Sequence, residues 1–526
     1  MAKTRSVTLF AILYPPSSIL AFPAMLPDLI EIVPLTKPVQ AEITVPGSKS
    51  ITNRALILAA LAKGETTLQG ALWSEDTQVM VECLKKLGFA VNVAPDPDEF
   101  CNRTIAVQGL GGNVPNAGTV EQPLELFVGN AGTAARFLSA LVCLGDGVYR
   151  LSGVPRMHER PQAALFEALR ELGYRVDSPN DKLPAIIFGS RRRGDESLTK
   201  KTGNDQSLLT SSPTGDGLPS CKVSIEASSQ FASALLLCAG VGGWEIEVVG
   251  ENEEESPYVA MTLKLIKAFP KNGGSFQIEP DASSGSYFLA VNKFVVGPEL
   301  MEYSDFFKMH ARTILFNPIK VANWPKSGWQ VDGDFFPVMD SVRNLHLYLH
   351  TFLSAKNETA LTKGEAENHR QMMNSKWPNG SSISRKSDLG DSVMAAIVLA
   401  SFEERSIHFT DLGRLRLQEC DRVLALKTEL TKCGATITES GDSLRVYPSS
   451  LHGTEIETYN DHRMAMCFAI LGLKVPGIKI KNPACVKKTF PNFFQKLAAA
   501  PPAGLGATIL DAKTQRPLSG TELFAD

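Results

Sequence analysis

Six short polar turns, each followed by a run of small and apolar residues, constrain the fold of this chain more than any other feature. The six segments begin at Gly47, Gly129, Ala227, Asp281, Leu389 and Tyr459. Each turn contains Ser, Asn, Asp or Thr, the residue types that cap helix N-termini. Each run is rich in Ala, Leu or Met, so its helix is expected to be buried on most sides. A unit that recurs in this way predicts a repeat architecture.

Two further elements accompany most of these runs. A short strand is predicted after a glycine, at residues 66–68, 148–151, 246–249, 407–409 and 478–480. An amphipathic helix is predicted next, at residues 76–87, 161–172, 258–269 and 421–433. Coincidental Ala-rich helices in an ordinary α/β protein are the alternative, but six recurrences favour the repeat. The sequence therefore predicts an α/β fold made of a repeated helix–strand–helix–strand module, with three copies in each of two domains.

Two stretches interrupt the pattern and are predicted to be insertions. Residues 191–220 begin with three arginines and continue with Ser, Thr, Gly and Asp, which is typical of a disordered surface segment. Residues 294–381 replace the end of the fourth unit and contain one interpretable piece, 323–335. His346 and His350 are spaced to face a metal from one helix, but no Glu follows His346 as in zincins, so a solvated loop is favoured.

The two ends of the chain lie outside the repeat. Residues 1–33 carry Lys3 and Arg5 before an apolar run, so they are either a targeting peptide or a poorly ordered extension. Residues 499–526 are predicted to form a C-terminal tail without a motif.

Composition excludes several classes of protein. The formal net charge of −3 lacks the basic excess of a nucleic-acid binder. The nine cysteines are scattered without a CxxC pair, which argues against a disulfide framework or a zinc site. A reducing compartment, the cytoplasm, is therefore expected, or a plastid if residues 1–33 are a targeting peptide. No apolar run is long enough for a transmembrane helix, so no membrane partner is expected.

Cations lie near the predicted helix starts, where the helix dipole disfavours them. The five are Lys49, Arg160, Arg422, Arg463 and Lys488. Any one of them could be a salt-bridged surface residue, but five at equivalent places indicate anions bound between the helix ends and these cations. The glycine-rich loop at 129–133 lets backbone N–H groups approach a phosphate or carboxylate, and it lacks the Lys-Ser/Thr of a nucleotide-binding P-loop.

Seven motifs then carry a family resemblance. They are PGSKSITNR (46–54), GNAGTAAR (129–136), PRMHERP (155–161), SSQ (228–230), QECDR (418–422), YNDHRMAM (459–466) and KTFP (488–491). Together they resemble the signatures of 5-enolpyruvylshikimate-3-phosphate synthases, in family order, over roughly residues 34–497. The resemblance implies the two-domain enolpyruvyl transferase fold, each domain made of three βαβαββ units, with the active site in the interdomain cleft. The first domain would comprise residues 34–47 and 281–498, and the second residues 48–280.

The resemblance also implies a role for each motif residue. Catalysis would fall to Asp391 and Glu419, with Lys49 as a partner. The residues expected to bind shikimate 3-phosphate are Lys49, Ser50, Arg54, Ser228, Ser229, Gln230, Asp391 and Gln418. Those expected to bind phosphoenolpyruvate are Lys49, Asn130, Gly132, Arg160, Gln230, Arg422, His462, Arg463 and Lys488. No metal or organic cofactor, a monomeric enzyme and competitive inhibition by glyphosate are further expectations.

Some features depart from the family pattern. The strands that family members usually have between residues 269 and 281 are largely missing. Gln418 stands where many members have Lys, Arg414 where many have Asn, and Phe137 where some have Pro. Two other functions therefore stay open. One is the related UDP-N-acetylglucosamine enolpyruvyl transferase, which uses a loop cysteine and lacks this His462-Arg463 context. The other is a non-catalytic binding protein derived from the family.

Overall fold

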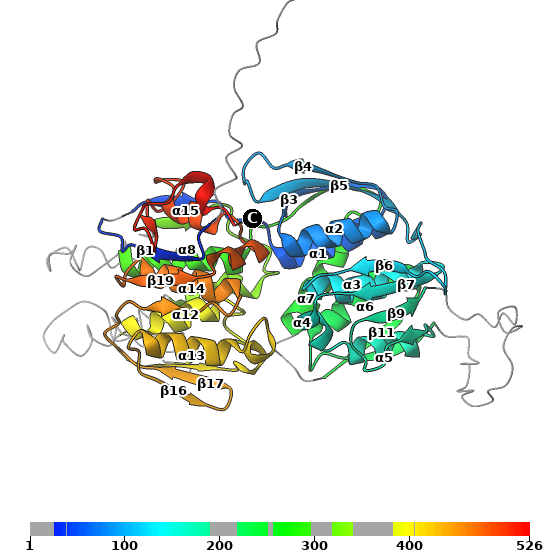
Figure 1. The fold of residues 1–526 in the computed structure, drawn as a ribbon. Helices are drawn as coiled ribbons and strands as arrows, with labels where there is room; N and C mark the ends of the chain where they lie inside the picture. The colour runs from blue at the N-terminus through cyan, green and yellow to red at the C-terminus, as the bar shows by residue number, and fades with distance from the viewer. Residues whose placement is uncertain are drawn as a thin grey trace, which may run out of the picture.

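The computed structural model shows two lobes side by side, each with its own hydrophobic core (Figure 1). The first lobe has its core within residues 26–45 and 287–525, and the second within residues 51–278. The structure describes residues 26–37, 39–189, 218–250, 256–295, 318–339, 382–403 and 405–525. The predicted domain boundaries stay a prediction, which these two cores support.

The chain passes between the lobes at two adjacent places. Ser48 N donates to Glu279 O at 2.8 Å, and Asp281 N donates to Pro46 O at 2.9 Å. Gly47 lies between them, and a Cβ there would collide with the backbone of Gly70. The two crossing segments are thus held together as a pair beside the starts of two helices.

The second lobe contains three sheets within its described residues, in the orders β12-β3-β5-β4, β6-β7-β9-β8 and β10-β11. Its strands are β3 (Lys63–Leu72), β4 (Val91–Pro95), β5 (Asn102–Leu110), β6 (Leu124–Phe127), β7 (Val148–Ser152), β8 (Val176–Asp177), β9 (Ala185–Phe188), β10 (Ser220–Ser224), β11 (Glu245–Val249) and β12 (Gly274–Gln277). Its helices are α1 (Lys49–Leu61), α2 (Glu75–Lys86), α3 (Gly132–Leu141), η1 (Val142–Leu144), α4 (Pro155–Glu159), α5 (Ala163–Glu171), α6 (Ser229–Gly242) and α7 (Ser256–Ala268).

The first lobe likewise contains three sheets in its described part, in the orders β18-β19-β1-β20, β14-β15-β17-β16 and β13-β2. Its strands are β1 (Leu29–Ile32), β2 (Ala41–Ile43), β13 (Ile319–Val321), β14 (Ser382–Ser384), β15 (Ile407–Thr410), β16 (Ile437–Ser440), β17 (Ser443–Val446), β18 (Glu455–Ile456), β19 (Ile478–Lys481) and β20 (Ile509–Asp511). Its α-helices are α8 (Ala282–Val295), α12 (Val393–Leu399), α13 (Arg422–Lys432), α14 (His462–Gly472) and α15 (Phe493–Ala498). Short 3₁₀ helices are η4 (Val331–Asp334), η5 (Ala400–Phe402), η6 (Gly413–Leu417), η7 (Pro483–Lys488) and η8 (Gly520–Leu523).

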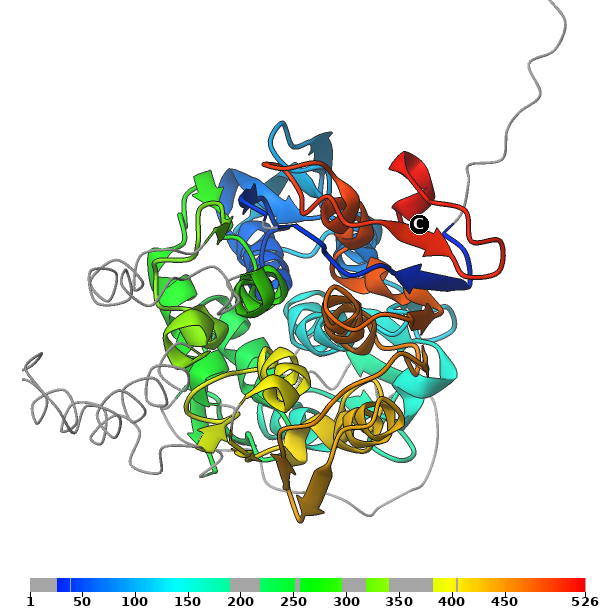
Figure 2. The ribbon, with the colours of Figure 1, turned by 90° about the vertical axis from the view of Figure 1, so that its left-hand side faces the viewer.

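The six predicted buried helices are present as α1, α3, α6, α8, α12 and α14. Every residue of α12 is buried, and Figure 2 looks along the helices, with those of the first lobe inside and its strands around them. The four amphipathic helices are present as α2, α5, α7 and α13, and all five predicted strands form. Their arrangement as three βαβαββ units per domain stays a prediction, because two of the sheets have only two strands among the described residues.

Polar side chains start several of these helices as the sequence predicted. Asp421 accepts a hydrogen bond from Leu424 N at 3.0 Å, and Asp461 accepts one from Arg463 N at 2.8 Å. Ser228 accepts one from Gln230 N at 3.2 Å. Each bond satisfies a donor that the first helical turn leaves without a partner.

The predicted C-terminal tail is wrong as a separate segment. β20 pairs antiparallel with β1, with Ile32 opposite Ile509. Leu505, Leu518 and Leu523 are buried in the core of the first lobe. This apolar burial, which a motif search does not detect, makes residues 499–525 part of the lobe.

The predicted insertions also need correction at their edges. Ser220 belongs to β10, while residues 190–217 lie outside the described residues. Within 294–381, residues 318–339 are part of the first lobe, because β13 pairs in parallel with β2. His346 and His350 lie outside the described residues, as does most of the N-terminal segment.

A strand also forms where the sequence predicted that strands are largely missing. β12, between residues 269 and 281, pairs in parallel with β3. No helix in the described part of the chain is both long and apolar enough to span a bilayer.

Candidate active site

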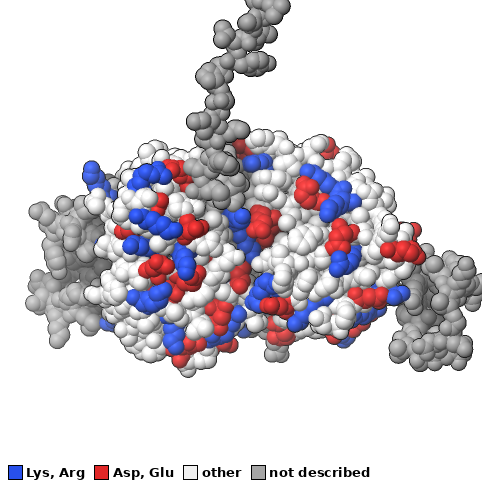
Figure 3. Space-filling model, in the orientation of Figure 1, with Lys and Arg blue, Asp and Glu red and all other residues white. Residues whose placement is uncertain are grey.

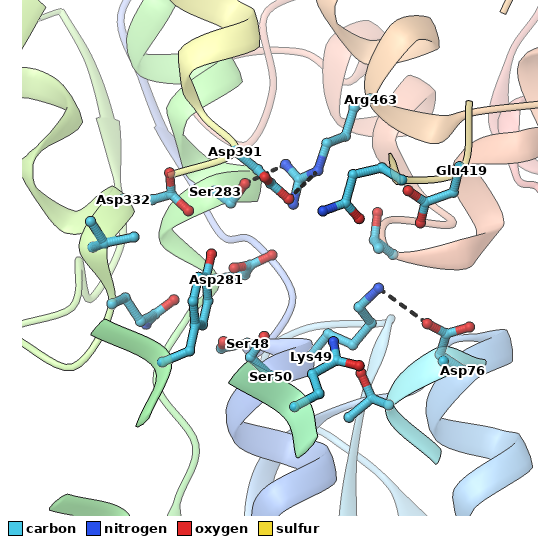
Figure 4. A pocket seen from close by; sticks show the side chains of 18 of the residues that line it. Ser48, Lys49, Ser50, Asp76, Asp281, Ser283, Asp332, Asp391, Glu419 and Arg463 are labelled. Atoms are coloured by element: carbon cyan, nitrogen blue, oxygen red, sulfur yellow. Dashed lines mark hydrogen bonds and ion pairs between the residues drawn. The ribbon is translucent and has the colours of Figure 1, made fainter. Parts of the chain in front are cut away.

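A cavity lies between the two lobes and is lined by residues from both. Its empty volume is about 1110 Å³, including space open to solvent. Charged side chains of both signs lie along this boundary in Figure 3. Figure 4 shows Lys49 and Asp76 from the second lobe facing Arg463, Asp391 and Glu419 from the first. The site is therefore assembled only when both lobes are folded and in contact.

Helix starts bring three of the predicted cations into the cavity. Lys49 is the first residue of α1, Arg422 the first of α13, and Arg463 the second of α14. The other two are placed differently from the prediction, since Arg160 follows the last residue of α4 and Lys488 ends η7. All five nevertheless line the cavity.

Glu419 lies in a cluster of cations. Its Oε1 is 2.7 Å from Lys488 Nζ, and its Oε2 is 2.6 Å from Arg422 Nη2. Burial alone would raise the pKa of this carboxyl, but Lys488, Arg422 and nearby cations hold it well below its usual range. Glu419 is therefore ionised in the structure described.

Asp391 is surrounded by three guanidinium groups. Arg385 Nη2 lies 3.1 Å from Oδ1, while Arg463 Nε lies 3.3 Å and Arg422 Nη1 3.5 Å from Oδ2. Burial opposes ionisation of Asp391, and the three arginines outweigh it and keep its pKa far below normal. Arg422 thus contacts both predicted catalytic carboxylates and is also paired with Asp461 at 2.7 Å.

The second lobe contributes a further set of polar contacts. Lys49 Nζ pairs with Asp76 at 3.1 Å, and Gln230 accepts a bond from Arg136 at 2.6 Å. Arg54 donates to Thr262 at 2.7 Å and lines the cavity. These bonds fix the side chains before any ligand binds.

His462 is buried at the start of α14, and neither ring nitrogen has a hydrogen-bond partner among the described residues. Burial lowers the pKa of its imidazole well below normal, so the ring is neutral at pH 7. Buried polar atoms are usually satisfied. The imidazole of His462 therefore lines the cavity with both ring nitrogens available to a ligand.

Fourteen of the sixteen predicted site residues line the cavity; Ser228 and Asn130 do not. Ser228 is fully buried as the cap of α6, and the carbonyl of Asn130 accepts a bond from Arg160 at 3.3 Å. The prediction did not include several other lining residues, among them Asp76, Asp281, Ser283, Asp332 and Arg385. Asp281 and Ser283 lie in the fourth repeated turn, so the repeat itself carried a signal for them.

The chemistry of this cavity suits small molecules with several negative charges. Among the described residues that line it, eight Lys and Arg side chains outnumber five Asp and Glu residues, and the carboxylates of Asp391 and Glu419 lie beside the cations, where they can exchange protons.

Comparison with known proteins agrees with this description. The chain matches a family model described as EPSP synthase (3-phosphoshikimate 1-carboxyvinyltransferase) over residues 33–497. A 3-phosphoshikimate 1-carboxyvinyltransferase of Trichormus variabilis is 32% identical over 491 residues, covering 89% of this chain and 98% of that protein. The protein of the same name from Psychromonas ingrahamii is 34% identical over 493 residues, with coverage of 89% and 98%.

Solved structures share the fold. An EPSP synthase from Acinetobacter baumannii has a TM-score of 0.59 at 19% identity, covering 91% of this chain and 99% of that one. The enolpyruvyl transferase NikO from Streptomyces tendae has a TM-score of 0.54 at 13% identity, covering 94% and 99%. The extent of the family match and the identity to its curated members show that this chain belongs to the EPSP synthase family and has the enolpyruvyl transferase fold.

Proposed function

We propose that the chain transfers the enolpyruvyl group of phosphoenolpyruvate to the 5-hydroxyl of shikimate 3-phosphate and releases phosphate. The observation that carries this proposal is the shared guanidinium of Arg422. It contacts Glu419 at 2.6 Å and Asp391 at 3.5 Å, so two carboxylates lie on either side of one cation in a single cavity. An addition–elimination reaction needs two proton-handling groups around one reacting carbon.

The two substrates divide the cavity between them. Ser50, Arg54, Ser229, Gln230 and Gln418 would hold shikimate 3-phosphate, with Asp391 at its 5-hydroxyl. The amide of Gly132 and the side chains of Arg160, Arg422, His462, Arg463 and Lys488 would hold phosphoenolpyruvate, with Lys49 between both substrates. Ser228 would act indirectly, because its hydroxyl caps α6 and so orients Ser229 and Gln230.

The steps follow from the chemistry of an enol phosphate. Glu419 protonates the methylene carbon, which makes the neighbouring carbon electrophilic. The 5-hydroxyl oxygen adds to that carbon while its proton passes towards Asp391. The tetrahedral intermediate then loses phosphate, and Glu419 takes back a proton from the methyl group to restore the double bond. The arginines and lysines stabilise the negative charge that gathers on the departing phosphate.

Glu419 must carry a proton to begin this sequence, yet the cations around it keep it ionised. Phosphoenolpyruvate brings a phosphate and a carboxylate to the same lysine and arginines. Once those cations are shared with the substrate, they stabilise the Glu419 carboxylate less. The pKa of Glu419 is therefore expected to rise on binding, which prepares it to donate a proton.

This reasoning predicts proton uptake on binding. Glyphosate, an unreactive anion, should be titrated calorimetrically into enzyme saturated with shikimate 3-phosphate, in two buffers of different ionisation enthalpy. Because the pKa of Glu419 rises when the anion binds, the wild-type protein should take up more protons than Glu419→Gln. Equal uptake by the two proteins would contradict the sharing of cations.

The proposal also covers the oligomeric state of the enzyme and its compartment. A monomer is proposed to be active, since fourteen of the predicted site residues, from both lobes of the same chain, already line the cavity together. A reducing compartment is proposed, because all nine cysteines have free thiols.

The direct test is phosphate release from the purified protein. We expect release only when both substrates are present, and equal rates with and without EDTA. Release that needs a divalent cation would overturn the proposed mechanism. Binding of both substrates without any release would instead identify a non-catalytic member of the family.

A further inference from the structure

Arg385 lines the cavity without belonging to any motif in the sequence. It follows the last residue of β14, and its backbone N–H donates to Thr410 O at 3.1 Å. The side chain is only 4% exposed, and its Nη2 contacts Asp391 Oδ1 at 3.1 Å. A buried guanidinium is thus directed at the carboxylate proposed to receive the 5-hydroxyl of the substrate.

Arg385 differs from the other two arginines around Asp391 in the oxygen that it contacts. Arg422 and Arg463 both approach Oδ2, and each has other partners. Arg422 is also bound to Asp461 and Glu419, and Arg463 donates to Ser283 and Tyr287. Within the described residues, Arg385 supplies the ion pair to Oδ1.

Two further acidic side chains interact with the charged groups around Asp391. Asp332 lies in η4 and is buried. Burial raises the pKa of its carboxyl, and the nearby charge of Asp391 raises it further. Its Oδ1 accepts a hydrogen bond from the backbone of Ser392, the residue after Asp391, at 2.9 Å. Asp281, at the start of α8, also interacts with Arg463. Arg463 is therefore shared among several carboxyl groups, and Arg385 adds positive charge next to Asp391, which the charge of Asp332 repels.

We propose that Arg385 is a positioning residue for the transfer reaction: it fixes the orientation of the Asp391 carboxylate so that this group accepts the proton of the substrate hydroxyl. This inference rests on the proposed function. The competing role is a structural one, in which Arg385 merely ties the end of β14 to the start of α12. The two roles predict different turnover in a protein that already carries Asp391→Asn. A positioning residue has no further effect there, whereas a structural residue still lowers turnover.

The test is a double-mutant cycle on phosphate release, with wild-type release measured first. Arg385→Met removes the charge at similar length, and we expect kcat to fall about tenfold while KM changes less. The acid limb of the pH profile should move to higher pH, because Asp391 loses a cation that favours its ionised form. In the Asp391→Asn background the same substitution should cause no further loss.

Two additional variants make the outcome decisive. Arg385→Lys keeps the charge but loses the planar fork, so kcat should fall while the acid limb stays in place. Arg416→Met is the matched control, because Arg416 pairs with Asp421, Glu439 and Asp442 and does not line the cavity. It should keep the wild-type kcat and pH profile.

The failures can be told apart. A wild-type protein that releases no phosphate refutes the proposed function itself. With an active wild type, multiplicative losses in the double mutant or an unmoved acid limb in Arg385→Met would overturn the positioning role. If Arg385→Met does not fold, as judged by circular dichroism, a lysine variant with wild-type kcat would overturn it as well.

Discussion

Glu419→Gln should retain substrate binding and lose turnover by about 10²- to 10⁴-fold, the usual contribution of a positioned acid–base group. The amide keeps the size of the side chain and its reach to Lys488 and Arg422, which lie 2.7 and 2.6 Å away in the native protein. It cannot protonate the methylene carbon or take the proton back. Loss of the negative charge leaves both cations free for the substrate, so KM for phosphoenolpyruvate should not rise. Steady-state phosphate release and a direct binding titration measure the two effects separately.

Glu429→Gln provides the matched control for this experiment. Glu429 lies on α13, the helix that begins at Arg422, is 1% exposed and pairs with Lys432 at 2.6 Å, but it does not line the cavity. Its amide variant loses the ion pair between the buried Glu429 carboxylate and the exposed Lys432 and should lose thermal stability, with turnover unchanged. Turnover near that of the wild type in Glu419→Gln would remove Glu419 from the acid–base role.

Sequence predicted those features of the fold that depend on neighbouring residues. A capping side chain and the apolar run after it are adjacent in the chain, so the starts of α6 and α14 could be located from local pattern alone. Lys49, Arg422 and Arg463 lie in the first turns of such helices and could be placed in the site by the same argument.

Contacts between distant segments could not be read in this way. β20 lies in the first lobe because Ile509 pairs with Ile32, nearly the whole chain away. Arg385 approaches Asp391 from the segment that follows the interruption at residues 294–381, and Asp332 approaches it from within that interruption. Ser228 shows a different limit, because the same hydroxyl can bind a phosphate or cap a helix, and only the fold shows that it caps α6.

Gly132→Ala should weaken inhibition by glyphosate about tenfold or more, the lower range for one added methyl group in a binding pocket. Gly132 is the first residue of α3 and lines the cavity. A Cβ at this position would lie 2.7 Å from both terminal nitrogens of Arg160 and 2.8 Å from Arg136 Nη1. Arg136 is held by Gln230 at 2.6 Å, whereas Arg160 makes a longer bond to Asn130 O at 3.3 Å. The methyl group is therefore expected to displace Arg160, a cation that both glyphosate and phosphoenolpyruvate would contact.

The two anions should respond differently because their lengths differ. Three atoms separate phosphorus from the carboxyl carbon in glyphosate, and two in phosphoenolpyruvate, so the longer inhibitor has less room for a displaced arginine. The inhibition constant of glyphosate should rise more than the KM for phosphoenolpyruvate. Gly240→Ala is the control, since Gly240 is an exposed helical glycine in α6 with no atom within 4 Å of the added Cβ. If Gly132→Ala and the wild type are equally sensitive to glyphosate, Gly132 does not line the inhibitor site.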